Sequence, residues 1–205
     1  MAVKKIYIVR HGQTKFNDLG IVQGRGVDAS LNDNGKQQAE LFYDYYKDVP
    51  FQHILISTLK RTYESVEKFI DDGIPYTSHE GLDEISWGVH EGAEASELRN
   101  RYFRNMVESW KNGNTDHQIE GGESPRDMQR RQEEGLRKLL EREHEKQLLL
   151  CMHGRAMRSF LCLLTGQDLC NMDTFKHSNL CLYVVEQNGE KFDIVEWNSV
   201  DHLWI

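Results

Sequence analysis

Short apolar runs that alternate with amphipathic stretches are the feature that most restricts how this chain folds. Residues 148–152 are apolar in succession, a pattern typical of a strand that is covered on both faces. Such a strand requires helices on both sides of its sheet, and amphipathic stretches of helical length separate the apolar runs. The alternation predicts an α/β fold with three layers (α/β/α), a mostly parallel central sheet and a small helical cap.

The same pattern places the individual elements. We expect strands at residues 6–9, 53–56, 148–152, 180–185 and 192–196, the last two joined by an Asn188-Gly189 turn. Helices are expected at residues 31–46, from a Ser57 cap through Ile70, from a Ser124 cap to about His144, and at residues 156–164. Their inward faces are predicted to carry Ala39, Leu41, Phe42 and Tyr45 in the first helix, and Met128, Leu136, Leu139 and Leu140 in the third.

The chain is expected to form a single domain over residues 1–205. Its 205 residues suit one core, and neither an internal repeat nor a low-complexity linker divides them. Residues 85–120 have weaker periodicity and contain Trp87 and Trp110. We expect this segment to be a helical cap inserted over the functional site.

Composition excludes several classes of protein. Acidic side chains outnumber basic ones by 33 to 25, giving a net charge of −8, which argues against nucleic acid as a partner. No apolar run approaches the roughly 20 residues of a membrane span, and the first run, residues 6–9, is too short for an export signal. We therefore expect a cytoplasmic protein without a membrane partner. Its four cysteines form no C-x-x-C pair and are expected to be reduced and packed in the core.

Two segments far apart in the sequence resemble each other, and both end in His-Gly. Residues 6–12 and 148–154 each consist of an apolar strand followed by a histidine, His11 or His153, and a glycine. Ligands of open α/β sheets bind beyond the carboxyl ends of the strands, so both imidazoles are expected to face one crevice. A single histidine after a strand usually serves packing, but two such strand ends favour a functional site. The glycines would let backbone N–H groups approach a bound group.

Arginines at the same strand ends indicate the kind of ligand. Arg10 directly precedes His11, and Arg61 lies near the start of the helix that follows the strand at residues 53–56. Two arginines and two histidines form a cationic pocket in an acidic protein. Guanidinium groups bind phosphoryl oxygens bidentately, so the pocket suits a small phosphorylated substrate.

A series of motifs resembles the histidine phosphatase superfamily, in its phosphoglycerate mutase-like branch. Arg10–Asn17 fits the signature R-H-G-x-T-x-x-N, and Ser57–Thr62 fits S-x-L-x-R-[AT]. Further matches lie at residues 23–35, 82–92, 122–124, 152–154 and 198–203. The matches extend over residues 6–203, nearly the whole chain, so the resemblance is highly specific.

This resemblance implies roles for individual residues. His11 would be the nucleophile that becomes phosphorylated, and Glu84 the proton donor. Arg10, Arg61 and His153 would hold the phosphoryl oxygens, while Asn17, Gln23, Gly24 and Gly154 would complete the pocket. No metal or cofactor is expected. These roles agree with in-line transfer to a neutral imidazole, with cations offsetting the charge on the transferred group.

Departures from the family pattern favour a phosphatase over a mutase. Ile85, Trp87 and Ala95 stand where mutases have the Arg, Tyr and Lys that would hold a phosphoglycerate carboxylate. The insertions typical of mutases are also missing at this length. His90 replaces a family aromatic, so the cap is expected to pack differently or to meet a different substrate. Phosphoglycerate mutase activity with a bisphosphoglycerate cofactor remains the alternative.

Other interpretations of the sequence fit less well. Cys151 and Arg158 have one residue too many between them for a cysteine phosphatase loop, and the glycines at residues 24–26 follow no strand, as a dinucleotide site would require. A phospho-ligand binding module without activity would not need the full set of proposed catalytic residues. Four cap residues are candidates for specificity or for a solvated helix face, with the latter favoured for each: Arg99, Arg101, Arg104 and Trp110.

Overall fold

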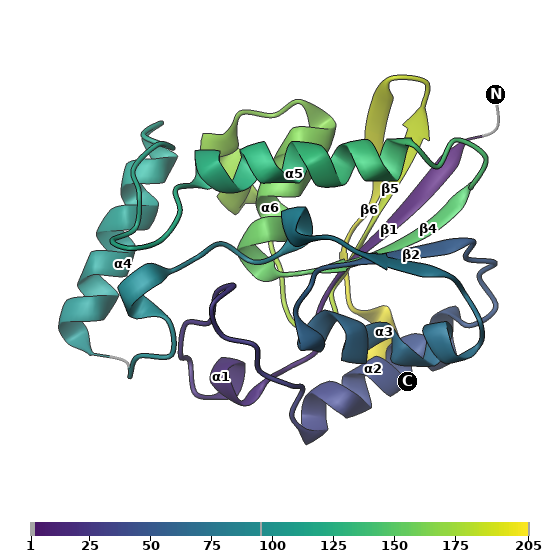
Figure 1. The fold of residues 1–205 in the computed structure, drawn as a ribbon, viewed down its shortest axis with the longest axis horizontal. Coiled ribbons are helices and arrows are strands. Elements are labelled where there is room, and N and C mark those ends of the chain that lie inside the picture. Colours follow the sequence, from purple (N-terminus) through teal and green to yellow (C-terminus); the bar gives the residue numbers. More distant parts are fainter. Residues whose placement is uncertain (1–2, 95, 205) are drawn as a thin grey trace.

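The computed structural model, which describes residues 3–94 and 96–204, contains one six-stranded sheet between layers of helices (Figure 1). The strand order is β3-β2-β4-β1-β5-β6. The strands are β1 (Lys4–Arg10), β2 (His53–Ile56), β3 (Tyr76–Ser78), β4 (Gln147–Met152), β5 (Leu182–Asn188) and β6 (Lys191–Ser199). Strands β1 to β4 pair in parallel, whereas β5 and β6 are antiparallel to their neighbours. The predicted α/β class with a mostly parallel sheet is confirmed.

Helices cover both faces of the sheet, and one helix stands apart. The longer helices are α2 (Asp33–Tyr46), α3 (Lys60–Asp71), α4 (Glu97–Lys111), α5 (Pro125–Leu140) and α6 (Gly154–Thr165), and α1 (Lys15–Asp18) is a single turn. Figure 1 shows α5 and α6 on one face of the sheet, α2 and α3 on the other, and α4 away from both. The sheet therefore has two apolar cores, one with α5 and α6 and one with α2 and α3.

The side chains of β1 are divided between these two cores because successive residues of a strand point to opposite faces. Ile6 and Ile8 pack in the α5–α6 core, and Val9 packs in the α2–α3 core. All three are fully buried. This central position fixes the carboxyl end of β1, beside that of β4, where the sequence predicted a site.

Three details of the predicted helices are wrong. Helix α5 ends at Leu140 instead of near His144. Leu140 was expected to face inward but is 36% exposed, because the buried stripe of the helix runs through Met128, Gln132 and Leu139. In α2, Tyr46 is buried and Tyr45 is exposed, since Tyr46 lies one helical turn beyond the buried Phe42.

The third error concerns Ser57, which does not cap α3. The N-cap position is Leu59, and no side chain of its own caps the helix. Asp28 takes over this role, with its carboxylate accepting from the Lys60 N–H at 2.8 Å. Ser57 lies two residues before the N-cap, and its hydroxyl accepts from the Leu59 N–H at 3.1 Å, lies 3.0 Å from the Thr62 hydroxyl and also contacts His153.

The closing hairpin and the cysteines also differ in detail from expectation. Asn188 pairs with Lys191, so the turn consists of Gly189 and Glu190, with Gly189 at φ 64°. All four cysteines are free, and Cys170 is only half-buried, whereas the other three are in the core as expected. A left-handed first turn residue suits a two-residue hairpin, which explains the shift by one position.

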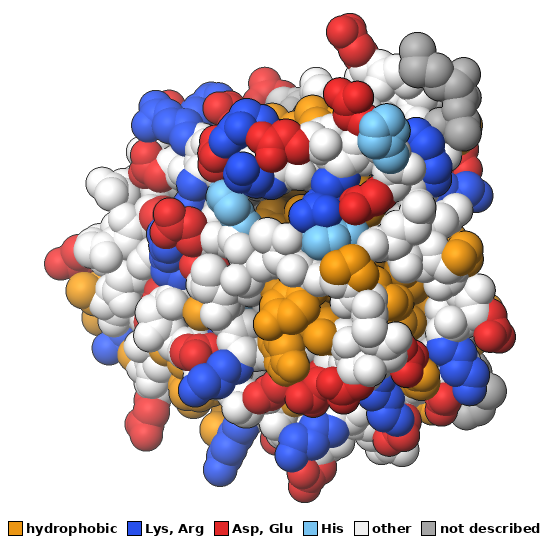
Figure 2. All heavy atoms as spheres, turned by 45° about the vertical axis from the view of Figure 1, so that its right-hand side comes forward, with side chains coloured by type: hydrophobic (Ala, Val, Ile, Leu, Met, Phe, Trp, Pro, Cys, Tyr) orange, Lys and Arg blue, Asp and Glu red, His pale blue; other side chains and the backbone are white. Residues whose placement is uncertain are grey.

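The charged side chains on the surface are of both signs (Figure 2), as the composition of the sequence leads one to expect. On the face drawn in Figure 2, acidic and basic side chains are interspersed around an exposed hydrophobic patch. Among the described residues, no helix is both long enough and apolar enough to cross a membrane.

Candidate active site

The carboxyl ends of β1, β4 and β2 bring the predicted histidines together. His11 follows β1, His153 follows β4, and Ser57 follows β2. The centroids of the His11 and His153 rings lie 5.2 Å apart. A hydrogen bond of 2.9 Å from the His11 N–H to the Met152 carbonyl joins the two strand ends. Both imidazoles thus lie at one edge of the sheet, as expected, but only His11 lines a pocket there.

The orientation of His11 leaves one ring nitrogen free. Its Nδ1 lies 2.6 Å from the carbonyl oxygen of Gly12, and because a carbonyl only accepts, Nδ1 carries the proton. Nε2 then holds a lone pair. Burial, together with the nearby charges of Arg61 and Arg10, holds the pKa of His11 well below its usual value. His11 is therefore a neutral imidazole with an unshared electron pair on Nε2.

Arg10 is held by a histidine that the sequence analysis missed. Its Nη1 donates to Nδ1 of His177 at 3.0 Å, and burial with the charge of Arg10 lowers the pKa of His177 to about 2. His177 also packs against Gly154, where an added Cβ would lie 2.7 Å from the ring. No motif contains His177, because its partners come from β1 and α6 and meet it only in the folded chain.

Arg61 and His153 form a buried pair whose hydrogen-bonding groups are largely occupied. Nε of Arg61 donates to Nδ1 of His153 at 3.1 Å, and its two Nη atoms donate to the carbonyls of Val27 at 2.7 Å and Gly24 at 3.1 Å. His153 Nδ1 is thus an acceptor, so Nε2 bears the proton and donates to Ser57 Oγ at 2.8 Å. Both side chains are fully buried. Arg61 retains two N–H groups without a partner among the described residues.

The amides of Asn17 and Gln23 face the same region. Oδ1 of Asn17 accepts from Thr14 and from Asn179, which leaves its NH₂ group without an acceptor among the residues described. Nε2 of Gln23 donates to Thr14 Oγ1 at 2.7 Å, and its Oε1 is buried without a partner. A half-turn of the Gln23 amide would direct an NH₂ group at the unpaired position, provided that the Thr14 hydroxyl then donates to Gln23 and no longer to Asn17.

One of the predicted backbone contacts is wrong. The Gly12 N–H donates to Ser65 Oγ at 2.9 Å and so is not free for a ligand. Gly24, which was predicted to complete the pocket, does not line it, and its carbonyl accepts from Arg61. A side chain at Gly24 would place Cβ 2.5 Å from the Ile85 carbonyl oxygen, so only glycine fits.

Glu84 lies at the amino end of α6. Its carboxylate accepts from the N–H groups of Ile85 at 2.9 Å, Arg155 at 3.0 Å and Ala156 at 2.8 Å. The last two belong to the first turn of α6, whose own N-cap residue provides no side-chain cap. Glu84 thus satisfies two N–H groups that the helix leaves unpaired. Its side chain is 7% exposed and lines the pocket beside His11.

A pocket of about 170 Å³ contains most of the predicted site. Six of its lining residues were predicted as site residues: Arg10, His11, Asn17, Gln23, Glu84 and Gly154. The other lining residues are Ile21, Val22, Trp87, Phe103, Arg155 and His177. Arg61, His153 and Gly24 do not line this pocket and lie behind its surface. The pocket combines a neutral imidazole, two guanidinium groups and a carboxylate.

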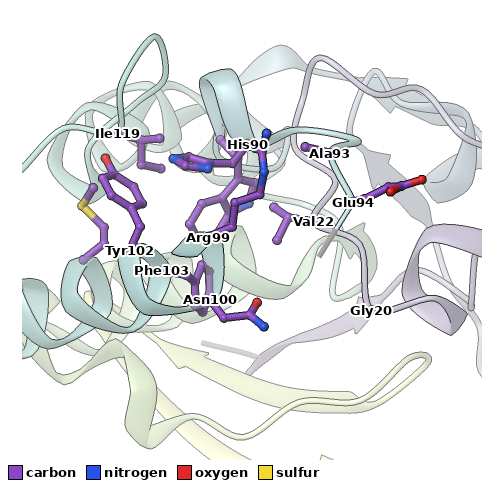
Figure 3. Close-up of a pocket in the computed structure, with 12 residues that line it drawn as sticks. Gly20, Val22, His90, Ala93, Glu94, Arg99, Asn100, Tyr102, Phe103 and Ile119 are labelled. Atoms are coloured by element: carbon purple, nitrogen blue, oxygen red, sulfur yellow. The ribbon is translucent and has the colours of Figure 1, made fainter. Parts of the chain in front are cut away.

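A second cavity of about 290 Å³ adjoins the pocket on the side of α4 and shares Val22, Trp87 and Phe103 with it. Figure 3 shows His90, Arg99, Tyr102 and Phe103 gathered around this cavity. His90 stacks on Tyr102 with 4.4 Å between centroids, and burial followed by the charge of Arg99 lowers its pKa. His90 therefore packs as a neutral aromatic ring against Tyr102.

The cap candidates separate into different environments. Arg99 lines the cavity and donates to the Val89 carbonyl at 3.2 Å, whereas Arg101 and Arg104 are exposed. Trp110 is fully buried and donates to the His117 carbonyl at 2.8 Å. Of the four, only Arg99 touches a cavity that adjoins the site.

The cysteine phosphatase interpretation finds no support at Cys151. Burial raises the pKa of its thiol far above the usual value, and the residue is 0% exposed. A fully buried thiol with a raised pKa stays protonated and is not a nucleophile at neutral pH. Cys151 is a packing residue of β4.

Comparison with known proteins places this site in a family. The family model described as the histidine phosphatase superfamily, branch 1, matches residues 6–200. This chain belongs to the histidine phosphatase superfamily. The resemblance inferred from the motifs is confirmed, and with it the enzyme class, a phosphomonoester hydrolase.

The relatives of this histidine phosphatase act on different phosphorylated compounds. Phosphoserine phosphatase 1 of Hydrogenobacter thermophilus is 27% identical over 205 residues, covering 97% of this chain and 94% of that protein. Fructose-2,6-bisphosphatase TIGAR B of Danio rerio is 31% identical over 157 residues, or 74% of this chain and 57% of its own. A phosphoserine phosphatase structure from Entamoeba histolytica shares the fold, with a TM-score of 0.84 and 23% identity over 98% of this chain and 99% of that one.

Proposed function

We propose that this histidine phosphatase hydrolyses small phosphomonoesters through a phosphohistidine formed on His11, with Glu84 as the proton donor. The observation that carries this proposal is the orientation of His11. Its Nδ1–H is fixed by the Gly12 carbonyl at 2.6 Å, and its ring lines a pocket that Arg10 and Glu84 also line. A neutral imidazole with a free Nε2 can attack phosphorus at neutral pH.

In the first step, Nε2 of His11 attacks the phosphorus in line with the leaving oxygen. The N–P bond forms as the P–O bond to the alcohol breaks, and Glu84, which takes up a proton as the substrate binds, gives that proton to the alcohol oxygen. Arg10 and the free NH₂ of Asn17 line the pocket and would donate to the equatorial oxygens. The products of this step are the alcohol, the Glu84 carboxylate and phosphohistidine.

In the second step, water cleaves the N–P bond. The Glu84 carboxylate takes a proton from the attacking water, and the released phosphate leaves His11 neutral. The three backbone N–H groups that donate to Glu84 hold its carboxylate in place between the two steps. This cycle conserves atoms and charge. Glu84 ends it protonated and, as phosphate departs, releases the proton that it took up with the substrate.

Arg61 and His153 are proposed to complete the phosphoryl site from behind. The two unpaired N–H groups of Arg61 would be its contribution to the phosphoryl oxygens. His153 would reach the phosphoryl group by exchanging its hydrogen bond to Ser57 Oγ for one to a phosphoryl oxygen. The charge of Arg61 and the ring of His153 also stabilise a phosphate placed against His11.

Residues 85–120 are proposed to form a cap within a single domain over residues 1–205, and to select the alcohol. This segment supplies Trp87 and Phe103 to the catalytic pocket, and most of the adjoining cavity of about 290 Å³. The mutase alternative gains no support from Ile85, which is fully buried, or from Trp87, which is apolar. Ala95 lies outside the described residues.

The experiment that tests this function is turnover of nitrophenyl phosphate by the wild type and by His11→Ala. The variant should lose all turnover. The wild type should form an acid-labile phosphoenzyme, which is detected as radiolabelled protein after reaction with a radiolabelled ester. His202→Ala is a matched control, because His202 is equally buried but packs against Phe42 of α2. Turnover in His11→Ala would contradict the proposal. A cytoplasmic location and the exclusion of nucleic acid stay predictions of the sequence.

A further inference from the structure

Arg155, which lines the catalytic pocket, has no role in the mechanism proposed above. It is the second residue of α6, and its backbone N–H donates to Glu84. The side chain is 8% exposed and lines the pocket together with His11, Glu84 and Phe103. A nearly buried guanidinium beside a reacting centre requires an explanation, because burying a charge without full pairing costs free energy.

Two contacts hold the Arg155 side chain in place. Nη1 donates to Oδ1 of Asp173 at 2.6 Å, and the guanidinium lies over the ring of Trp110, 5.5 Å from its centroid. Trp110 is fully buried in α4. The side chain therefore extends from the Glu84 end of α6 towards α4, with its orientation fixed on both sides.

The pairing of Arg155 is incomplete. Asp173 Oδ1 also accepts from Nη1 of Arg158 at 2.5 Å, so one carboxylate faces two guanidinium groups. Within residues 3–94 and 96–204, Nη1 is the only nitrogen of the Arg155 guanidinium that has an acceptor. Its Nε and Nη2 are not among the buried polar atoms that lack a partner, so both remain accessible to solvent. Because Arg155 lines the pocket, the unpaired donors of its guanidinium are available to a bound substrate.

The place of Arg155 decides which part of a substrate it meets. Glu84, the proposed donor to the leaving oxygen, bonds the backbone of Arg155, and the side chain runs from there towards α4. In the proposed mechanism, the phosphoryl group lies on the other side of the leaving oxygen, against His11. We propose that Arg155 binds a second anionic group, a carboxylate or a phosphate, on the alcohol part of the substrate. This inference rests on the proposed function and specifies its substrate class.

The test compares esters that differ only in this second group. 3-Phosphoglycerate and glycerol 3-phosphate differ by a carboxylate in place of a hydroxymethyl group, and propane-1,3-diol bisphosphate and monophosphate differ by one phosphate. The wild type should prefer the anionic member of at least one pair by about tenfold or more in kcat/KM. The pair with the larger ratio identifies the group as a carboxylate or a phosphate. Arg155→Met should reduce this ratio about ten- to hundredfold, and Arg155→Lys should retain part of it.

Arg158→Met is the matched control. Arg158 shares Asp173 with Arg155 but does not line the pocket. Its loss leaves Asp173 to Arg155 alone and should lower the preference much less than Arg155→Met does. Equal losses for all four esters in Arg155→Met, or no preference in the wild type, would overturn the inference while turnover of nitrophenyl phosphate still supports the proposed function. If no ester were turned over, calorimetric binding to the wild type would decide: 3-phosphoglycerate or the bisphosphate must bind more tightly than its partner, and only with Arg155 present.

Discussion

Replacing Glu84 by Gln separates proton donation from structural support, because the carboxylate serves both. The amide oxygen of the introduced glutamine could still accept from Ile85 and Ala156, but its NH₂ would face the Arg155 N–H that now donates to Oε2 at 3.0 Å. Losing one buried hydrogen bond to a charged group costs roughly 1.5–3 kcal/mol. Removing the charge from the amino end of α6 adds about 0.3–1 kcal/mol. We expect Glu84→Gln to lose roughly 2–4 kcal/mol of unfolding free energy and to stay folded.

The catalytic loss should depend on the leaving group. An alkyl phosphate leaves as a strongly basic alkoxide and needs the proton, so kcat/KM should fall by roughly 10²–10⁴. Nitrophenyl phosphate leaves as a stable phenolate, and its loss should be much smaller. The assay is kcat/KM for both esters well below the unfolding temperature of the variant. This parameter reports the first phosphoryl transfer without interference from a slow second step.

Asp83→Asn provides the matched control. Asp83 is the preceding residue, is 3% exposed, and accepts from the backbone and hydroxyl of Thr58 at 2.9 Å. Its substitution also removes a buried, hydrogen-bonded carboxylate, but Asp83 does not line the pocket. The ratio of the two ester activities should stay at the wild-type value in Asp83→Asn. Equal losses for both esters in Glu84→Gln would refute proton donation by Glu84.

The buried histidines, the phosphoryl site and the absent mutase ligands each lead to a further prediction. Burial and neighbouring arginines hold the pKa values of His11 and His153 well below 6.5, so both imidazoles should titrate well below that pH by NMR; midpoints near 6.5 would contradict the neutral nucleophile. Because the unfolded chain then binds protons that the native chain does not, chemical unfolding should show a free energy that falls as pH drops below about 6.5, by up to about 1.4 kcal/mol per pH unit for each histidine. Vanadate should inhibit, as a mimic of the five-coordinate phosphorus, and chelators should not; inactivation by EDTA that Mg²⁺ or Zn²⁺ reverses would indicate a different mechanism. Finally, 3-phosphoglycerate with a bisphosphoglycerate primer should yield little 2-phosphoglycerate by NMR, because buried Ile85 and apolar Trp87 replace mutase carboxylate ligands; efficient isomerisation would favour the mutase alternative.

Local sequence patterns were sufficient to predict the layers of the fold and the centre of the site. Apolar runs placed the buried strands β1 and β4, because a strand with helices on both sides must be apolar throughout. Parallel strands end at the same edge of a sheet, so two strands ending in His-Gly were enough to bring His11 and His153 to one place. Local rules of this kind fail at helix ends, as the early end of α5 at Leu140 shows.

The pairing of the side chains in the site, by contrast, follows from the folded chain alone. Ser57 looks like a helix cap in the sequence, yet it bonds the His153 ring, because the ends of β2 and β4 lie side by side. Glu84 caps α6 from a loop, and 71 positions separate it from Arg155, whose N–H it accepts. Arg155 gains its orientation from Asp173 and Trp110, which belong to other elements. Hydrogen bonds and ion pairs depend on distances between segments remote in sequence, and no local periodicity records those distances.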